Sequence, residues 1–216
     1  MIMDGNGRWA KAQGKERFFG HIAGVETVRR MVEASVEFGV KYLSLFAFST
    51  ENWGRPEKEV SSLMELMVKS MVKEVPALNA QGVRFMVLGD RSSLSPKMNE
   101  AIDEFMAMTE GNDRLTLILM LSYSGKWDIL QAMKKLSDKE DITEADIAAN
   151  LVTAGLPDPD LIIRTSGEQR LSNYFLWQGA YSELYFSPVL WPDFSKEDYR
   201  AALEDYASRD RRYGKV

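Results

Sequence analysis

Four short apolar runs alternate along this chain with segments whose apolar residues recur at helical spacing. Runs without polar alternation are typical of strands buried on both faces, and strands separated by helices pair in parallel. This order predicts a single α/β domain over residues 1–216, with a mainly parallel central sheet flanked by helices. The strands are expected at Lys41–Ala47, Val83–Leu88, Leu115–Leu121 and Leu161–Ile163.

Two apolar stripes predict helices next to these strands. One spans residues 25–36, and the other, which is rich in methionine, spans residues 60–75. Residues 1–3 read as the end of a first strand that is too short to pair well, so we expect this strand to be truncated at its N-terminus. The polar stretches at 140–146 and 155–160 are interpreted as loops within the domain.

Composition limits the chemistry that is available. The sequence has no cysteine and one histidine, His21, which excludes a disulfide framework, thiolate metal sites and sites built from several imidazoles. A metal ion would therefore be a hard cation held by oxygen atoms. The formal charge of −5 predicts no general attraction to nucleic acid or anionic lipid, so a phosphate needs a local cluster of arginines. No apolar run reaches the roughly 20 residues of a membrane span and no leader segment is visible, so a cytoplasmic location is expected.

Three polar segments follow three expected strands, at the edge where parallel sheets bind ligands. Residues 4–9 (DGNGRW) combine two glycines, which allow close approach of the backbone, with a carboxylate and a guanidinium. That set suits a diphosphate and its cation. Residues 49–56 (STENWGRP) and 164–173 (RTSGEQRLSN) add hydroxyls, amides and further arginines.

Each segment also has a purely structural interpretation. A tight turn capped by Asp4 explains the first segment, and a helix N-cap before Pro56 explains the second. An ion pair with Glu168 accounts for either arginine of the third segment. The residues by themselves leave these alternatives open.

Six ordered motifs resemble signatures of the cis-prenyltransferase family, of the undecaprenyl diphosphate synthase type. They are MDGNGRWA, FGH followed by AGV, AFSTENWGRP, RTSGEQRLSN, YSELYF and VLWPDF, and together they span the chain. The resemblance implies an α/β fold with an apolar tunnel for a growing prenyl chain. It also implies an enzyme that uses Mg²⁺ and adds isopentenyl diphosphate to an allylic diphosphate in sequential cis-condensations.

The same resemblance implies roles for individual residues. Asp4 would hold Mg²⁺ against the allylic diphosphate and Glu183 would complete the metal site, although an edge strand explains Glu183 from the residues alone. Asn52, helped by Ser49, would lie near the proton that the isopentenyl unit loses. His21 would help to protonate the leaving group, since a histidine pKa of about 6.5 permits this. The implied substrate-binding residues are Gly5, Asn6, Gly7, Arg8, Trp9, Arg17, His21, Ser49, Thr50, Glu51, Trp53, Arg55, Arg164, Arg170, Leu171 and Ser172.

The resemblance further implies substrates, product and partners. Farnesyl diphosphate is the expected primer, and undecaprenyl diphosphate, a lipid-carrier precursor for cell-wall synthesis, is the expected product. Arg212-Tyr213-Gly214 resembles a tail that reaches the partner's isopentenyl site in a homodimer. Transient contact with the inner face of the membrane is expected for product release, and no nucleic-acid partner is expected.

Five methionines are interpreted as core and not as tunnel wall, namely Met64, Met67, Met71, Met86 and Met120.

Two departures from the family pattern bear on product length. Residues 122–127 (SYSGKW) stand where many members carry Asn-Tyr-Gly-Gly-Arg-Trp, and Gly179 replaces a larger apolar residue, so a short-chain product is an alternative.

Three other functions can be weighed against this family. A phosphatase of the haloacid dehalogenase type would need a second aspartate where Asn6 stands. A non-catalytic partner subunit would have lost catalytic groups that are present here, and the Asp-Asp-x-x-Asp motif of trans-type prenyltransferases is absent.

Overall fold

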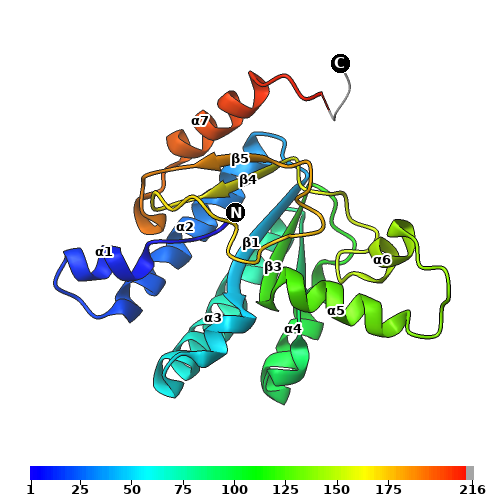
Figure 1. The fold of residues 1–216 in the computed structure, drawn as a ribbon. Helices are drawn as coiled ribbons and strands as arrows, with labels where there is room; N and C mark the ends of the chain where they lie inside the picture. Colours follow the sequence, from blue (N-terminus) through cyan, green and yellow to red (C-terminus); the bar gives the residue numbers. More distant parts are fainter. Residues whose placement is uncertain (213–216) are drawn as a thin grey trace.

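The computed structural model describes residues 1–212, and a parallel sheet lies at its centre (Figure 1). β1 (Tyr42–Ser49), β3 (Leu115–Tyr123) and β2 (Val83–Leu88) pair in that order, and β4 (Leu161–Arg164) pairs with β5 (Glu183–Phe186). Ile2 connects the two groups, because it forms one parallel bridge with Phe46 of β1 and another with Arg164 of β4. The order across the sheet is therefore β2, β3, β1, Ile2, β4 and β5.

The predicted strands are all present. Each one lies within two residues of the bounds expected from its apolar run. Every pairing between them is parallel, so the mainly parallel sheet predicted from the order of the elements is confirmed. The carboxyl ends of β1 and β4 lead directly into the polar segments at 49–56 and 164–173.

Helices cover both faces of the sheet (Figure 1). The larger core cluster holds α2 (Arg17–Glu37), α3 (Glu57–Ala80) and α4 (Pro96–Thr109) with β1, β2 and β3. α7 (Lys196–Ala207) belongs to the same cluster and packs against α2 and β5. A smaller cluster, rich in aromatic rings, lies on the other face beneath α5 (Gly125–Lys135), and α6 (Glu144–Asn150) packs against α5. The remaining elements are α1 (Asn6–Ala12), η1 (Thr50–Gly54), η2 (Arg91–Ser93) and η3 (Trp191–Asp193).

The two longest helices, α2 and α3, have 21 and 24 residues. Both carry the apolar stripes expected from the sequence, and α3 buries Val60, Leu63, Met71 and Val75 along its stripe. Their other faces are polar and charged. Across residues 1–212, no helix combines the length and the apolar character needed to cross a membrane.

Candidate active site

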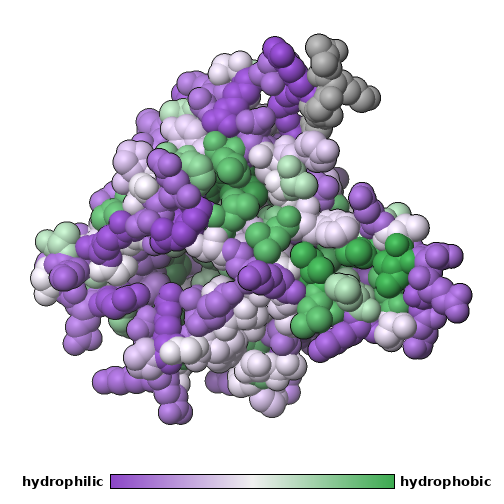
Figure 2. Space-filling model, viewed as in Figure 1, coloured by the Kyte–Doolittle hydropathy of each residue, from purple (hydrophilic) through white to green (hydrophobic). Residues whose placement is uncertain are grey.

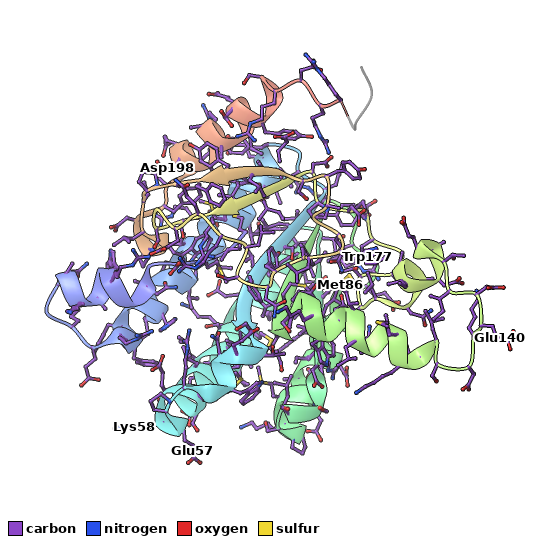
Figure 3. All side chains as sticks on the ribbon, viewed as in Figure 1. Glu57, Lys58, Met86, Glu140, Trp177 and Asp198 are labelled. Carbon is purple, nitrogen blue, oxygen red and sulfur yellow. The ribbon has the colours of Figure 1, made fainter. Side chains whose placement is uncertain are left out.

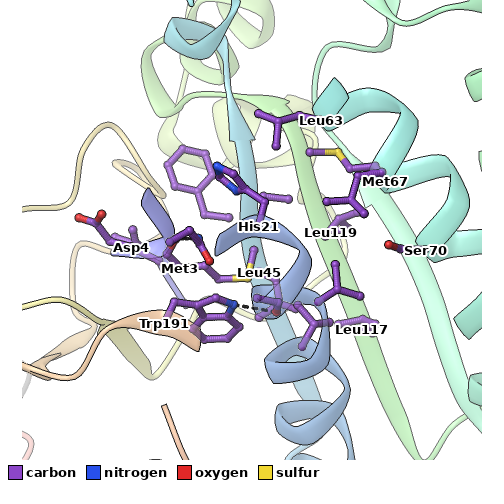
Figure 4. Close-up of a pocket in the computed structure, with 18 of the residues that line it drawn as sticks. Met3, Asp4, His21, Leu45, Leu63, Met67, Ser70, Leu117, Leu119 and Trp191 are labelled. Atoms are coloured by element: carbon purple, nitrogen blue, oxygen red, sulfur yellow. Dashed lines mark hydrogen bonds between the residues drawn. The ribbon is translucent and has the colours of Figure 1, made fainter. Parts of the chain in front are cut away.

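A cavity of about 440 Å³ lies between α2, α3 and the sheet (Figure 4). One end is polar, and the opposite end is walled by aliphatic side chains of α2, α3, β1 and β3. Nine of the predicted site residues line this cavity, and they come from all three polar segments and from α2. They are Asp4, Asn6, His21, Ser49, Asn52, Arg55, Arg164, Arg170 and Ser172.

Asp4 and Arg164 form the central contact of the polar end. Arg164 donates from Nη2 to Oδ2 of Asp4 at 2.8 Å, and its side chain is only 4% exposed. The other carboxylate oxygen of Asp4 accepts from the backbone N–H of Gly5 at 2.7 Å. Thr165, which was not predicted as a site residue, accepts from the backbone N–H of Asp4 and donates to its carbonyl oxygen. These two hydrogen bonds join the segment that follows Ile2 to the segment that follows β4.

The loop after β4 is shaped around Arg164. Its Nη1 donates to the carbonyl oxygen of Arg170 at 2.6 Å and to Oγ of Ser172 at 2.7 Å. Ser166, Ser172 and Asn173 have positive φ angles, a conformation that costs a non-glycine residue free energy and needs support from its surroundings. The buried guanidinium therefore holds the loop backbone as well as Asp4.

A second cluster of charges borders this loop. Arg8 donates to Ser166 and lies 3.2 Å from Glu168, which also pairs with Arg170. Arg8 and Arg170 are at least half exposed, so two guanidiniums face solvent beside the buried Arg164. This arrangement suits an anion that binds from solvent.

Close packing of α2 brings Asn6 to the cavity. A Cβ atom on Gly20 would lie 1.9 Å from the carbonyl oxygen of Asn6, so only glycine allows this approach. Gly5 precedes α1 with a φ of 105°, which lets the chain turn sharply after Asp4. Among the described residues, Oδ1 of Asn6, Nε2 of His21 and Nε of Arg164 are buried polar atoms with no hydrogen-bond partner in the chain, and all three residues line the cavity.

The segment after β1 combines capping with a hydrogen-bonded wall. Ser49 and Asn52 form a capping box around η1, in which Oδ1 of Asn52 accepts from the backbone N–H of Ser49 at 3.1 Å. Trp53 donates from Nε1 to Oγ of Ser122 at 2.9 Å. Glu51 accepts from the Asn173 side chain at 2.6 Å, which links this segment to the loop after β4. The capping box therefore caps η1, and the expected side-chain cap before α3 is absent, because the N-cap of α3 is Pro56. Ser49 and Asn52 also line the cavity, and their role in the site stays a prediction.

Arg17 and Arg55 meet at one carboxylate near His21. Glu59 of α3 lies 3.2 Å from Arg55 and 3.8 Å from Arg17. Glu59 was not predicted as a site residue, because a glutamate in the first turn of a helix has an ordinary role at the helix dipole. Its position next to two candidate diphosphate ligands is visible only in the folded chain.

His21 differs from its expected protonation behaviour. Burial, followed by the charge of Arg55, lowers the pKa of His21 to about 4. The pKa of His21 in the chain without substrate is therefore below the ordinary histidine value of about 6.5, and the ring is neutral at neutral pH. A neutral imidazole can still donate one hydrogen bond to a phosphate oxygen.

This shift predicts a pH dependence of stability. The unfolded chain binds the histidine proton near pH 6.5 and the folded chain only near pH 4, so stability falls as the pH falls between these values. We expect the free energy of unfolding to drop in this window by about 2–3 kcal/mol more in the native protein than in His21→Gln. Urea unfolding at stepped pH measures the difference. Because His21 is the single histidine, its ring resonances report the pKa directly, and titration near pH 6.5 in the folded protein would contradict the assignment.

Comparisons with known proteins identify the family. Residues 2–214 match the prenyltransferase (undecaprenyl diphosphate synthase) family model. The chain belongs to the cis-prenyltransferase family. It is 48% identical to the isoprenyl transferase of Chlorobaculum tepidum, over 100% of this chain and 84% of that protein. It is 46% identical to the (2E,6E)-farnesyl-diphosphate-specific ditrans,polycis-undecaprenyl-diphosphate synthase of Escherichia coli K12, over 99% of this chain and 88% of that protein.

Solved structures agree with this assignment. Lavandulyl diphosphate synthase from Lavandula x intermedia, in complex with dimethylallyl diphosphate, matches with a TM-score of 0.95 at 35% identity. That match covers 99% of this chain and 96% of the other. A probable undecaprenyl diphosphate synthase from Campylobacter jejuni matches with a TM-score of 0.82 at 34% identity, over 89% and 92% of the two chains. This cis-prenyltransferase is thus an enzyme of prenyl chain elongation on an allylic diphosphate.

The two predicted metal ligands of the cis-prenyltransferase lie apart within one chain. Glu183 is the first residue of β5, opposite Leu161, whereas Arg164 and its partner Asp4 lie at the other end of the β4–β5 pair. Three residues along a strand correspond to roughly 10 Å. The Glu183 carboxylate accepts from Arg209 at 2.7 Å. A role for Glu183 in metal binding therefore stays a prediction.

The polar end nevertheless fits Mg²⁺ bound together with a diphosphate. Within residues 1–212, no three acidic or imidazole side chains gather into a ligand set. Mg²⁺ is commonly held by one or two carboxylates together with substrate phosphates and waters. Asp4 places one such carboxylate at the cavity, and Arg8 and Arg164 both lie within ion-pair distance of it, so cations are present that could bind phosphate oxygens.

The methionines of α3 belong to the core, as interpreted from the sequence, and two of them also border the apolar end of the cavity. Met67 and Met71 of α3 line the cavity, beside Leu117 and Leu119 of β3 (Figure 4). Met86 and Met120 belong to the smaller cluster on the other face of the sheet, and Figure 3 shows Met86 beside α5. Met67 and Met71 lie on the stripe of α3, whereas Met86 and Met120 lie on strands, but apolar spacing alone could not separate these two surroundings, because both are apolar.

Other predicted residues lie outside the cavity lining. Trp9 donates from Nε1 to Asp193, and Leu171 packs with the smaller cluster. The other predicted residues that do not line the cavity are Gly5, Gly7, Arg8, Arg17, Thr50, Glu51 and Trp53. Of the predicted tail, only Arg212 is among the described residues, and Tyr213 and Gly214 lie outside them.

Proposed function

We propose that this cis-prenyltransferase extends farnesyl diphosphate with isopentenyl diphosphate in the presence of Mg²⁺, and that its product is undecaprenyl diphosphate. The observation that carries the proposal is the single cavity that joins the Asp4–Arg164 centre to an apolar interior. A diphosphate needs the first part and a prenyl tail needs the second. The lipid-carrier role in cell-wall synthesis follows from this product.

Two diphosphates would share the polar end. The allylic diphosphate would bind near Asp4, Asn6 and Arg55, with its tail in the apolar part of the cavity. Isopentenyl diphosphate would bind to Arg170 and Ser172 beside the exposed Arg8. The contact between Asp4 and Arg164 lies between the two groups and would place the reacting carbons next to each other.

Catalysis would consist mainly of positioning and charge stabilisation. Bound Mg²⁺ supplies neutralisation of the charge that builds on the leaving diphosphate. Arg55 and the neutral His21 would donate hydrogen bonds to that leaving group, and the buried Arg164 would hold Asp4 in place. The new carbon–carbon bond forms as the allylic carbon–oxygen bond breaks, and the isopentenyl unit then loses a proton. Asn52 is too weak a base to take this proton outright, so it would position the substrate or relay the proton to water or to the departing diphosphate.

Replacing Asn52 separates its structural role from its catalytic role. Asn52→Ala removes the acceptor of the capping box and the amide group, so we expect about 1 kcal/mol lower stability and a 10- to 100-fold lower kcat. Asn52→Asp keeps the acceptor and restores most of the stability. If the amide acts on substrate, kcat stays low in Asn52→Asp. Unchanged turnover in Asn52→Ala, measured by incorporation of labelled isopentenyl diphosphate, would remove Asn52 from the mechanism.

A homodimer is part of the proposal. Leu130 and Met133 of α5 and the neighbouring Leu176 are exposed large apolar side chains, and Figure 2 shows hydrophobic surface gathered in this region. Exposed apolar patches of this kind favour association between proteins. Sedimentation equilibrium measures the mass of the assembly.

We also propose a cytoplasmic enzyme with transient membrane contact, since a long prenyl product leaves water for lipid.

The decisive experiment is chromatographic sizing of the products made from labelled isopentenyl diphosphate and several allylic primers. Incorporation that requires both farnesyl diphosphate and Mg²⁺, and that ends at undecaprenyl length, supports the proposal. Short products would restrict the function to a shorter chain. An absence of incorporation would favour a non-catalytic subunit, and phosphate release from phosphomonoesters would favour a phosphatase.

A further inference from the structure

A charged pair interrupts the apolar wall of the cavity. Arg29 of α2 and Glu74 of α3 both line the cavity, and they form two hydrogen bonds, Nε to Oε2 at 2.9 Å and Nη2 to Oε1 at 2.6 Å. The side chains are 37% and 19% exposed, so the pair borders solvent as well as the cavity. At this point the two helices are held together by a bidentate ion pair in a wall that is otherwise mainly aliphatic.

The pair lies deep in the cavity. Arg29 follows His21 by eight residues along α2, which corresponds to about 12 Å from the polar end. Glu74 follows Ser70 by one helical turn, and Figure 4 shows Ser70 on α3 at the side of the cavity away from Asp4. The lining continues by about one further turn on each helix. A growing chain would therefore reach this pair after it has filled most of the cavity.

α3 has a weak point at the same place. Pro76, two residues after Glu74, lies inside the helix. Proline has no N–H to donate to the carbonyl oxygen of Val72, and its ring crowds that turn. The turn that carries Glu74 thus lacks one hydrogen bond of the α3 backbone. The hydrogen bonds between Arg29 and Glu74 connect this turn to α2.

The cavity volume shows why this turn matters. A cavity of about 150 Å³ accepts one benzene ring, so about 440 Å³ has room for roughly 18 carbon atoms. Part of this volume belongs to the polar end, so the space left for a prenyl tail is at most about that of a farnesyl chain, whereas an undecaprenyl chain is several times longer. If the proposed function holds, elongation therefore requires a wall of the cavity to move.

We propose that the Arg29–Glu74 pair is a latch that holds the Pro76 turn of α3 against α2 and thereby limits the length to which the prenyl chain grows. This inference rests on the proposed function for its substrate. Once the chain reaches the latch, further growth separates two ions whose hydrogen bonds are partly shielded from water. Elongation past the latch then requires the pair to open and is slower relative to release, so the latch shortens the average product but does not stop growth at the volume of the closed cavity.

The first test needs no substrate. We expect amide exchange in residues 72–78 to become about tenfold faster in Glu74→Gln and Arg29→Gln, since either change removes a charged hydrogen-bonded pair. The double variant should exchange no faster than the singles, because both remove the same contact. Glu65→Gln is the matched control, as Glu65 lies on the same helix, is 72% exposed and pairs only loosely with Lys69 at 3.6 Å. Equal exchange in Glu74→Gln and Glu65→Gln would overturn the latch.

The second test measures product length with farnesyl diphosphate, Mg²⁺ and labelled isopentenyl diphosphate. We expect Glu74→Gln to shift the products toward longer chains by one or more isoprene units, with the native lengths kept in Glu65→Gln. Faster exchange with unchanged or shorter products would overturn the role in length. If the native enzyme incorporates nothing, the proposed function fails, and the exchange experiment still decides whether the latch exists.

Discussion

Asp4→Asn is expected to lower kcat about 1000-fold while the protein stays folded. Asp4 is the carboxylate at the polar end of the cavity, and the substitution removes the proposed protein ligand for Mg²⁺ at the leaving diphosphate. The asparagine keeps the shape of the side chain and can still accept a hydrogen bond from Arg164. Steady-state incorporation of labelled isopentenyl diphosphate measures the loss, and titration with Mg²⁺ should show a higher metal requirement in any residual activity.

A surface aspartate offers a matched control for this change. Asp103 of α4 also pairs with an arginine, Arg91, at 2.8 Å, but it is exposed and does not line the cavity. Asp103→Asn should therefore keep native kcat and native Mg²⁺ dependence. Native turnover in Asp4→Asn, or an equal loss in both variants, would show that Asp4 is not the metal-binding carboxylate.

Arg164→Gln is expected to cause the largest loss of stability among these variants, about 3 kcal/mol. The change leaves the partly buried Asp4 carboxylate without its cation and removes the donors to Ser172 and to the Arg170 carbonyl. The loop after β4 contains residues with positive φ that these contacts support. Urea unfolding measures the stability, and turnover should fall together with it.

Arg170 provides the comparison, because it belongs to the same loop but is 58% exposed and pairs with Glu168. Arg170→Gln should change the free energy of unfolding by less than about 1 kcal/mol. Its main effect should be a higher KM for isopentenyl diphosphate. If Arg164→Gln were as stable as Arg170→Gln, the hydrogen bonds of the buried Arg164 guanidinium would not stabilise the loop after β4.

The strands and the polar segments could be predicted because the information is local. An uninterrupted apolar run such as Leu115–Leu121 specifies a buried strand, and the order of strands and helices specifies parallel pairing. Since carboxyl ends of parallel strands share one edge, the segments that follow β1 and β4 were expected to meet. The cavity lining confirms that they do.

Local patterns could not separate residues with similar sequence surroundings. Met67 and Met86 both read as core methionines, but one lines the cavity and the other lies on the opposite face of the sheet. Glu74 and its partner Arg29 are 45 residues apart, so nothing near Glu74 in the sequence indicates the pair. Glu59 pairs with Arg55 four residues before it, but its contact with Arg17 arises only in the fold. These roles depend on which helix faces are brought together.

The sequence alone determined the α/β architecture, the family resemblance and the polar segments that build the site. Only the tertiary structure decided how those segments act. Asp4 and Arg164 are 160 residues apart and meet because Ile2 lies between β1 and β4. His21 has a lowered pKa because folding removes water from the ring and brings Arg55 near it. Burial and charge proximity arise from long-range packing, so a pattern of neighbouring residues cannot contain them.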